Sequence, residues 1–175
     1  AFVRAAPTAR VGVHPSIVRT PAGTTFSPAS QRILVSALNE DGVIRSTAAS
    51  QEMDAGELKG RAQWDLFENA MGELGEAVRS GPAGPGYHLV MEFLVSPHPT
   101  GGNFVGGIHC YILDGQGRNA FSFLLNSHHR ILVDAALHSE TATDAGLNEL
   151  VEKASRTGAT ALRLQLQAVA GDADE

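Results

Sequence analysis

Three histidines and the only cysteine of the chain lie within one segment, IHCYILDGQGRNAFSFLLNSHHR at residues 108–130. Imidazole and thiolate groups bind transition metals and act as bases or nucleophiles in catalysis. Because Cys110 is the single cysteine among 175 residues, an internal disulfide and any zinc site with several cysteines are excluded. The candidate chemistry is therefore that of histidine combined with carboxylates.

Alternation along the predicted strands decides which of these side chains can meet. In the segment YHLVMEFLV every second residue is apolar, which places His88 and Glu92 together on the opposite face. The same rule assigns Cys110 to the core and His109 to the face with His88. We expect Cys110 to behave as a small buried apolar residue, and the histidine-bearing face to be exposed.

A metal site would require these side chains to converge. If strands 86–95 and 103–113 form a hairpin, His88 lies near His109 or Tyr111, depending on the register. Two imidazoles and a carboxylate on one surface could bind a transition metal. The candidate ligands are His88, Glu92, His109 and His128. An exposed sheet face ordinarily carries polar residues, however, so the prediction is no metal, no cofactor and no catalytic residue.

Hydrolase chemistry has a weaker basis in the sequence. Ser127, His129 and Asp134 include the residue types of a catalytic triad, but no G-x-S-x-G elbow accompanies them. The motifs H-E-x-x-H, G-x-x-x-x-G-K-[ST] and C-x-x-C are also absent from the sequence. The chain is therefore predicted more readily as a binding protein than as an enzyme.

The first half of the chain predicts a strand, helix, strand unit. The segment VGVHPSIV suits a first strand interrupted at Pro15, and PAGTTF after it is expected to be a loop. Ser27 followed by Pro28 is a strong helix start, because serine caps free amides and proline is tolerated at the first helical position. A second strand is expected to begin at residues 43–44.

The second half predicts a helix, three strands and a final helix. From Arg61 the apolar residues recur at helical spacing, at Trp64, Phe67, Met71, Leu74 and Val78. After residues 87–95 come NFVGGIHCYIL and RNAFSFLLN, joined by DGQG. Residues 130–137 are ambiguous between strand and helix, and the pattern after Thr143 is helical with a weak point at Gly158.

The DGQG segment predicts a tight hairpin with a two-residue turn. Pairing Asp114 with Gly117 then places Cys110 opposite Phe121 and His109 opposite Ser122. The fold class that follows is α+β, a two-layer α/β arrangement with a mixed sheet: β-α-β, a helix, a three-stranded antiparallel meander and a carboxy-terminal helix.

Charge and length bound the partners and the organisation. With 19 acidic and 13 basic residues the formal net charge is −6, and no basic stripe follows a phosphate backbone, so nucleic acid is not an expected partner. No apolar run approaches the roughly 20 residues of a transmembrane helix. The organisation predicted is a flexible leader at 1–9, one α/β domain at 10–168 and an acidic tail at 169–175.

Several segments together resemble a known domain type. A strand such as Val11 to Val18, a helix from SPASQRIL to NEDGVIRS, a second helix, YHLVMEFLV and the hairpin IHCYILDGQGRNAFSF are similar to the small α/β domain of bacterial envelope accessory lipoproteins. That domain type recurs in the amino-terminal domain of TolB and in CsgG, where a strand ends in an aspartate-glycine turn like that of Asp114 to Gly117. The resemblance covers residues 10–165.

The resemblance implies a periplasmic, non-enzymatic protein that binds another component of the cell envelope, and it supplies no catalytic residue. Cys110 lies inside a predicted strand and no cysteine stands at the start of the chain to carry a lipid, so the resemblance leaves membrane anchorage open. The leading hypothesis is an accessory or assembly protein that binds a protein partner through its sheet surface or edge. The alternatives are a small histidine-based metal-binding protein or hydrolase, and a structural subunit of a larger complex, organellar or cytoplasmic.

Overall fold

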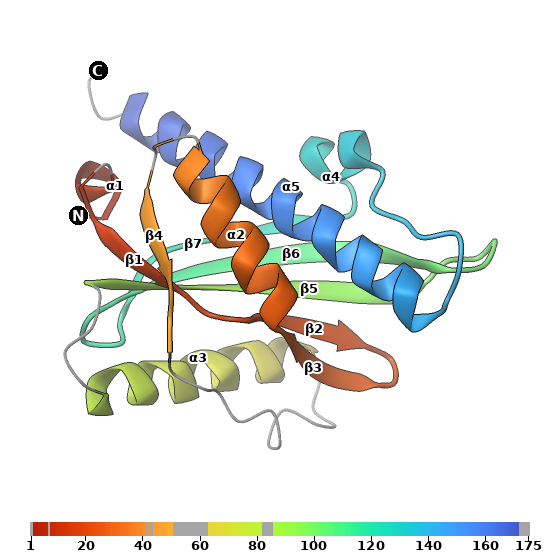
Figure 1. Ribbon diagram of the computed structural model, residues 1–175, viewed down its shortest axis with the longest axis horizontal. Coiled ribbons are helices and arrows are strands. Elements are labelled where there is room, and N and C mark those ends of the chain that lie inside the picture. The colour runs from red at the N-terminus through yellow and green to blue at the C-terminus, as the bar shows by residue number, and fades with distance from the viewer. Residues whose placement is uncertain are drawn as a thin grey trace.

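A computed structural model describes residues 2–6, 8–40, 42, 44–50, 63–81 and 86–171, without the side chains of 63–70, 170 and 171. The elements in chain order are α1 (Phe2–Ala5), β1 (Arg10–Val13), β2 (Ser16–Thr20), β3 (Gly23–Ser27), α2 (Pro28–Glu40), β4 (Arg45–Ala48), α3 (Gln63–Ser80), β5 (Tyr87–Pro97), β6 (Asn103–Asp114), β7 (Asn119–Asn126), α4 (Arg130–Ala135) and α5 (Asp144–Gly171) (Figure 1). This is an α+β fold with a mixed sheet, a meander and a carboxy-terminal helix, as predicted.

The sheet has β5 near its centre. Strands β1 and β2 both run parallel to β5 and are separated by His14 and Pro15, where proline removes a backbone donor. Beyond them, β4 pairs with β1 in parallel and β3 pairs with β2 antiparallel. On the other side of β5, β6 and then β7 add antiparallel strands, which confirms the predicted meander.

The predicted β-α-β unit is present, with β1 and β4 in parallel and α2 between them. Ser27 caps α2, because its hydroxyl accepts a hydrogen bond from the Ser30 amide at 3.1 Å. The prediction of a loop over PAGTTF is wrong, since β3 begins at Gly23 directly after a tight turn. Gly23 has φ of +147°, a conformation that glycine adopts without strain, and this lets the chain reverse within two residues.

The turn between β6 and β7 also differs from the prediction. The Asp114 amide donates to the Arg118 carbonyl at 2.8 Å, so three residues rather than two form the loop, and Gly117 closes it at φ of +73°. A further register shift follows at Ile112/Leu113. Cys110 therefore lies opposite Phe123, and His109 opposite Leu124. The predicted register is wrong by two residues, which leaves each side chain on its predicted face.

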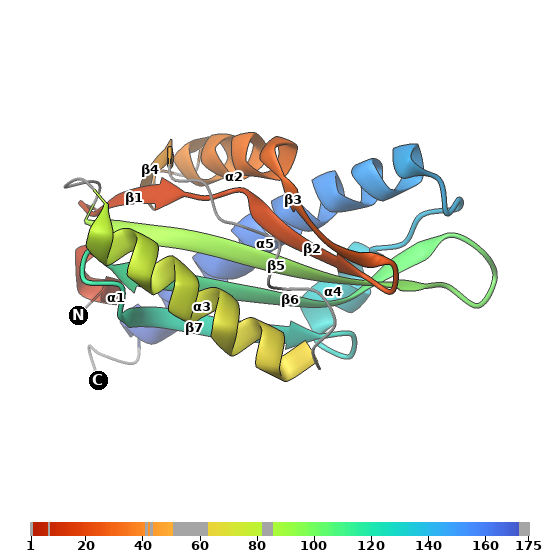
Figure 2. The same cartoon turned by 90° about the horizontal axis from the view of Figure 1, so that it is seen from below.

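Helices cover both faces of the sheet. Helices α2 and α5 contact each other on one face, over a core that includes Leu89, Met91 and Phe93 of β5. The view from below shows α3 lying across the other face, over β5, β6 and β7 (Figure 2). There Leu74 and Val78 of α3 pack with an apolar cluster of the sheet. Helix α3 thus adds a layer to the two that the sequence predicted.

The long helix α5 continues through Gly158 without the break that its sequence suggested. A Cβ atom at Gly158 would lie 2.5 Å from Met91 Sδ, so glycine here permits close packing of α5 on β5. The segment that was ambiguous in sequence forms α4, and His129 caps it. Of the predicted acidic tail, 169–171 belong to α5 and 172–175 lie outside the described residues.

The predicted flexible leader is instead packed. Residues 2–5 form α1, and the Phe2 side chain is 1% exposed within the main core. Its ring meets Tyr87 edge to face, with 4.7 Å between centroids, and lies 6.2 Å from the ring of Phe121. Burial of Phe2 in the core holds α1 in place, so this short helix does not have to be stable on its own.

Candidate functional site

A buried polar cluster lies on the α3 face of the sheet. Its centre is Glu92 on β5, which forms an ion pair with Arg19 on β2. The Oε2 atom of Glu92 also lies 3.1 Å from Nδ1 of His109 on β6. Glu92, Arg19 and His109 are 1%, 7% and 6% exposed as whole residues. The arrangement follows from the register, because Glu92 is directly opposite His109 and beside Ile17, two residues before Arg19.

Burial sets the protonation states in this cluster. It lowers the pKa of His109 to about 4, and the positive charge of Arg19 acts in the same direction. The Glu92 carboxylate is already paired with Arg19, so it compensates little for a second cation. The His109 ring is thus neutral at pH 7. Burial also lowers the pKa of Arg19, while Tyr111 nearby raises it.

A second pair of histidines lies on the same face. His14, at the break between β1 and β2, places its Nε2 atom 3.1 Å from His88 Nδ1, and both side chains are buried. One ring donates and the other accepts, so the pair requires at least one neutral imidazole. Burial lowers the pKa of His88, which favours that neutral form.

The structure therefore separates the candidate ligands that the sequence placed together. His88 contacts His14, while Glu92 and His109 contact each other and Arg19. His128 lies exposed in the turn after β7. Within the described ranges, no three histidine, cysteine, aspartate or glutamate side chains converge as metal ligands.

The expectation that this face is exposed is wrong, because α3 lies across it. Sequence reasoning also missed Arg19 of the cluster and His14 of the second pair. A signal for His14 was available, since Val11 and Val13 are core residues and alternation then puts His14 on the opposite face.

The other reactive side chains have structural contacts. Cys110 is fully buried, as predicted, and burial raises the pKa of its thiol well above the ordinary range. His129 accepts the Ile131 amide at 3.3 Å as the cap of α4. Asp134 pairs with Arg130 at 3.3 Å one turn earlier. These contacts engage two of the three residues considered for a triad.

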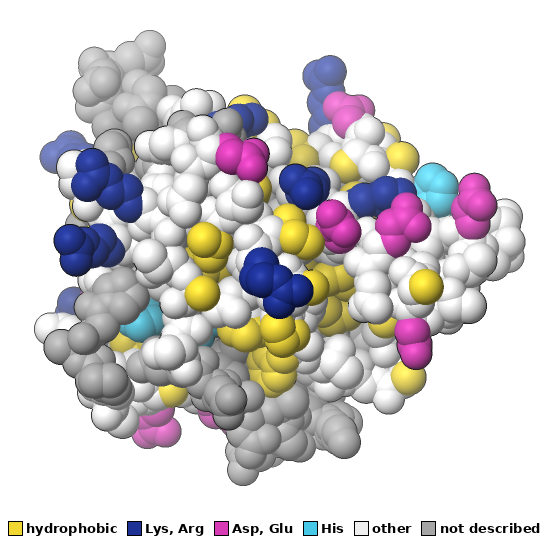
Figure 3. Space-filling view, viewed as in Figure 1, with side chains coloured by type: hydrophobic (Ala, Val, Ile, Leu, Met, Phe, Trp, Pro, Cys, Tyr) yellow, Lys and Arg dark blue, Asp and Glu magenta, His cyan; other side chains and the backbone are white. Residues whose placement is uncertain are grey.

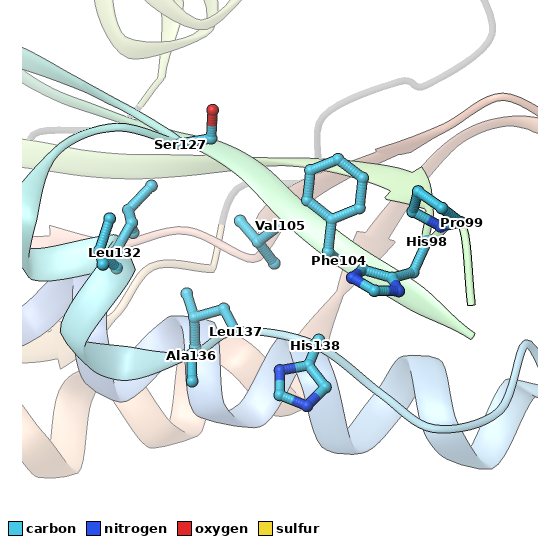
Figure 4. Close-up of a pocket in the computed structure, with 10 residues that line it drawn as sticks. His98, Pro99, Phe104, Val105, Ser127, Leu132, Ala136, Leu137 and His138 are labelled. Carbon is cyan, nitrogen blue, oxygen red and sulfur yellow. The ribbon is translucent and has the colours of Figure 1, made fainter. Parts of the chain in front are cut away.

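A shallow groove of about 300 Å³ lies between the start of β6 and α4. Figure 4 shows His98 and His138 toward one end and Leu132 toward the other, with Val105 and Leu137 between them. The imidazole rings of the two histidines are 6.1 Å apart. His98 Nδ1 lies 2.7 Å from the Thr100 hydroxyl oxygen and 3.3 Å from the Thr100 amide nitrogen. The groove can hold an apolar group beside two imidazoles.

The outer edge of the sheet at β7 is long and largely apolar. Its sequence, NAFSFLLN, holds neither charge nor proline, and Leu124 is 54% exposed. By contrast, the face over α2 and α5 carries side chains of both charges (Figure 3). Some of these form pairs one helical turn apart, such as Lys153 with Glu149 at 2.8 Å.

The described helices include none that is long and apolar enough to cross a bilayer. No protein-family model matches the chain, and no curated protein matches it. Among solved structures, one described as the crystal structure of an uncharacterized protein aligns with 90% of this chain and 92% of its own, at 9% identity and a TM-score of 0.33.

Proposed function

We propose that this protein is a non-enzymatic binding module that holds an extended segment of another protein along the edge of β7. The partner adds a strand to the sheet through main-chain hydrogen bonds, and its alternate side chains meet those of β7. The resemblance of the sequence to envelope accessory domains makes the bacterial periplasm the proposed setting and another assembly component the proposed partner.

The character of β7 as an edge strand carries this proposal. It is eight residues long and, among the described strands, pairs with β6 alone. Proteins ordinarily protect such edges with charges, proline or very short strands. The other side of the sheet ends in two shorter strands: β4 has four residues and begins with Arg45, and β3 has five residues. The long uncharged edge of β7 is thus suited to pairing.

The side chains of β7 favour a partner that is apolar at alternate positions. Phe121 and Phe123 face the α5 side and are only partly buried. Ser122 and Leu124 face the α3 side and are exposed. A strand beside β7 would complete the burial of both phenylalanines and cover Leu124, which favours association through the hydrophobic effect.

The alternative of a histidine-based metal-binding protein has less support. The histidines and the glutamate that it requires are engaged in two separate buried contacts beneath α3. The candidate with an exposed ring, His128, belongs to neither contact.

Short synthetic peptides test the proposal directly. Peptides that alternate apolar and uncharged polar residues are expected to bind and to slow amide hydrogen exchange in β7. A peptide in which proline replaces one central residue is expected to bind much less, because proline has no backbone N–H to donate to the ladder. Binding is measured by fluorescence anisotropy.

Matched variants locate the binding surface. Leu124→Lys is expected to weaken binding at least tenfold, whereas Leu164→Lys, at a position on α5 that is 43% exposed, leaves it unchanged. Equal effects of the two variants, or equal binding of the proline peptide, would contradict strand addition at β7.

A further inference from the structure

We infer that, when no partner is bound, the β7 edge pairs with β7 of a second copy of this chain. The inference rests on the proposed function, because it concerns the same edge, and it adds a regulatory step. A dimer formed in this way has its binding edges occupied, so a partner must displace the second copy.

The side-chain pattern of β7 allows two copies of this strand to pair in antiparallel orientation. In an antiparallel pair about a two-fold axis perpendicular to the sheet, residues directly opposite one another lie on the same face. With the axis at Phe123, this residue meets Phe123 of the second copy, and Phe121 meets Leu125 of the second copy. These residues already share the α5 face in one copy.

The opposite face also forms direct pairs about the same axis. Ser122 of each copy lies opposite Leu124 of the other, and both residues are exposed in the single chain. Aromatic and apolar cross-strand pairs stabilise neighbouring strands. The register therefore removes apolar surface from water on both faces at once.

The absence of charge on β7 also allows a second copy of the chain to pair with it. Two copies bring the same residues together, so any charge on β7 would meet its own sign near the axis; the segment NAFSFLLN carries none. Arg118, just before the strand, is paired with Asp114 at 2.8 Å and so enters the interface with its charge balanced. One strand per copy makes a small interface, and we expect a concentration-dependent equilibrium of monomer and dimer.

Sedimentation equilibrium of the wild-type chain over a wide concentration range tests the inference. The wild type is expected to shift from monomer to dimer, and the β7 amides are expected to gain protection from exchange at high concentration. The variant S122K/L124K places lysines opposite one another across the axis and is expected to be monomeric. The control Leu164→Lys dimerises like the wild type.

A charge-exchange variant tests the register. In S122E/L124K each glutamate lies opposite a lysine of the other copy, so dimerisation is expected to return, and to weaken in high salt. The positions are exposed, so circular dichroism is expected to show the native fold in each variant. A monomeric S122E/L124K would overturn pairing centred on Phe123.

The two proposals fail in distinguishable ways. A wild type that stays monomeric, with exchange of the β7 amides unchanged at every concentration, overturns self-pairing, even where the peptides bind in a Leu124-dependent manner. A dimer that S122K/L124K abolishes, in a protein to which no peptide binds, supports self-pairing and removes the proposed function.

Discussion

Glu92 shows why a buried carboxylate is kept in the middle of this sheet. It lies on β5 and contacts side chains of the strands on either side, Arg19 of β2 and His109 of β6. Such a pair contributes little net stability compared with apolar residues of the same size, but the loss of one partner leaves an uncompensated buried charge. The contacts of Glu92 therefore favour the observed register of the three strands over shifted registers, in which its charge would be buried without a partner.

His109 gives the stability of the protein a defined pH dependence. Its folded-state pKa is about 4 against an ordinary value of 6.5. Between these values the unfolded chain binds a proton that the folded chain does not, so the free energy of unfolding falls as the pH falls through this window. The slope is about 1.4 kcal/mol per pH unit for one such proton. Below about pH 4 this contribution no longer changes.

Urea unfolding between pH 7 and pH 4 measures this dependence. His109→Gln is expected to make the decline shallower but not to abolish it, because the lowered pKa of His88 acts in the same direction. His128→Gln, at an exposed position, is the control and should keep the wild-type slope. Identical slopes in all three proteins would show that His109 does not titrate differently in the folded state.

At the scale of elements, alternation was the most informative property of the sequence. It placed Cys110 in the core and His109 on the other face, and both assignments are confirmed. It did not reveal that α3 covers that face, because a helix with one apolar stripe can pack on either side of a sheet. The contact between His14 and His88 depends on the pairing of β1 with β5, which no local pattern specifies.

The packing of α3 against the turn between β6 and β7 can be tested with two glycines of the same helix. A Cβ at Gly75 would lie 2.7 Å from the Gly117 carbonyl oxygen, a backbone atom that cannot move aside. A Cβ at Gly72 would meet nothing within 4 Å. Alanine is preferred over glycine in a helix interior by about 1 kcal/mol, so this gain applies to both positions.

Thermal and urea unfolding distinguish the two variants. Gly72→Ala is expected to stabilise the protein by up to about 1 kcal/mol. Gly75→Ala is expected to destabilise it by about 1–3 kcal/mol, because the helix must move away from the turn. Stabilisation of both variants by the same amount would mean that α3 does not lie against Gly117.

For the whole molecule, the amino-terminal residues join parts of the chain that are far apart in sequence. Helix α1 contacts α5 and β7, and its Phe2 ring meets Tyr87 at the start of β5. The sequence of residues 1–9 shows no periodic pattern of apolar residues, and the four residues of α1 are too few to form a stable helix alone. This order therefore comes from tertiary contacts, which is why the sequence predicted a flexible leader.

Phe2→Ala measures how far those contacts support the whole fold. Truncation of a buried phenylalanine typically costs about 3–5 kcal/mol, and Phe2 is 1% exposed. If α1 unfolds together with the rest of the domain, Phe2→Ala is expected to lower the free energy of unfolding by this amount. Urea unfolding followed by far-ultraviolet circular dichroism measures the change. Arg4→Ala alters an exposed residue of the same helix and is expected to change stability by less than about 0.5 kcal/mol. A Phe2→Ala protein as stable as Arg4→Ala would show that α1 can leave the core without loss of the sheet. The ring of Phe121 at the β7 edge would then be more exposed, which favours the pairing proposed for that edge.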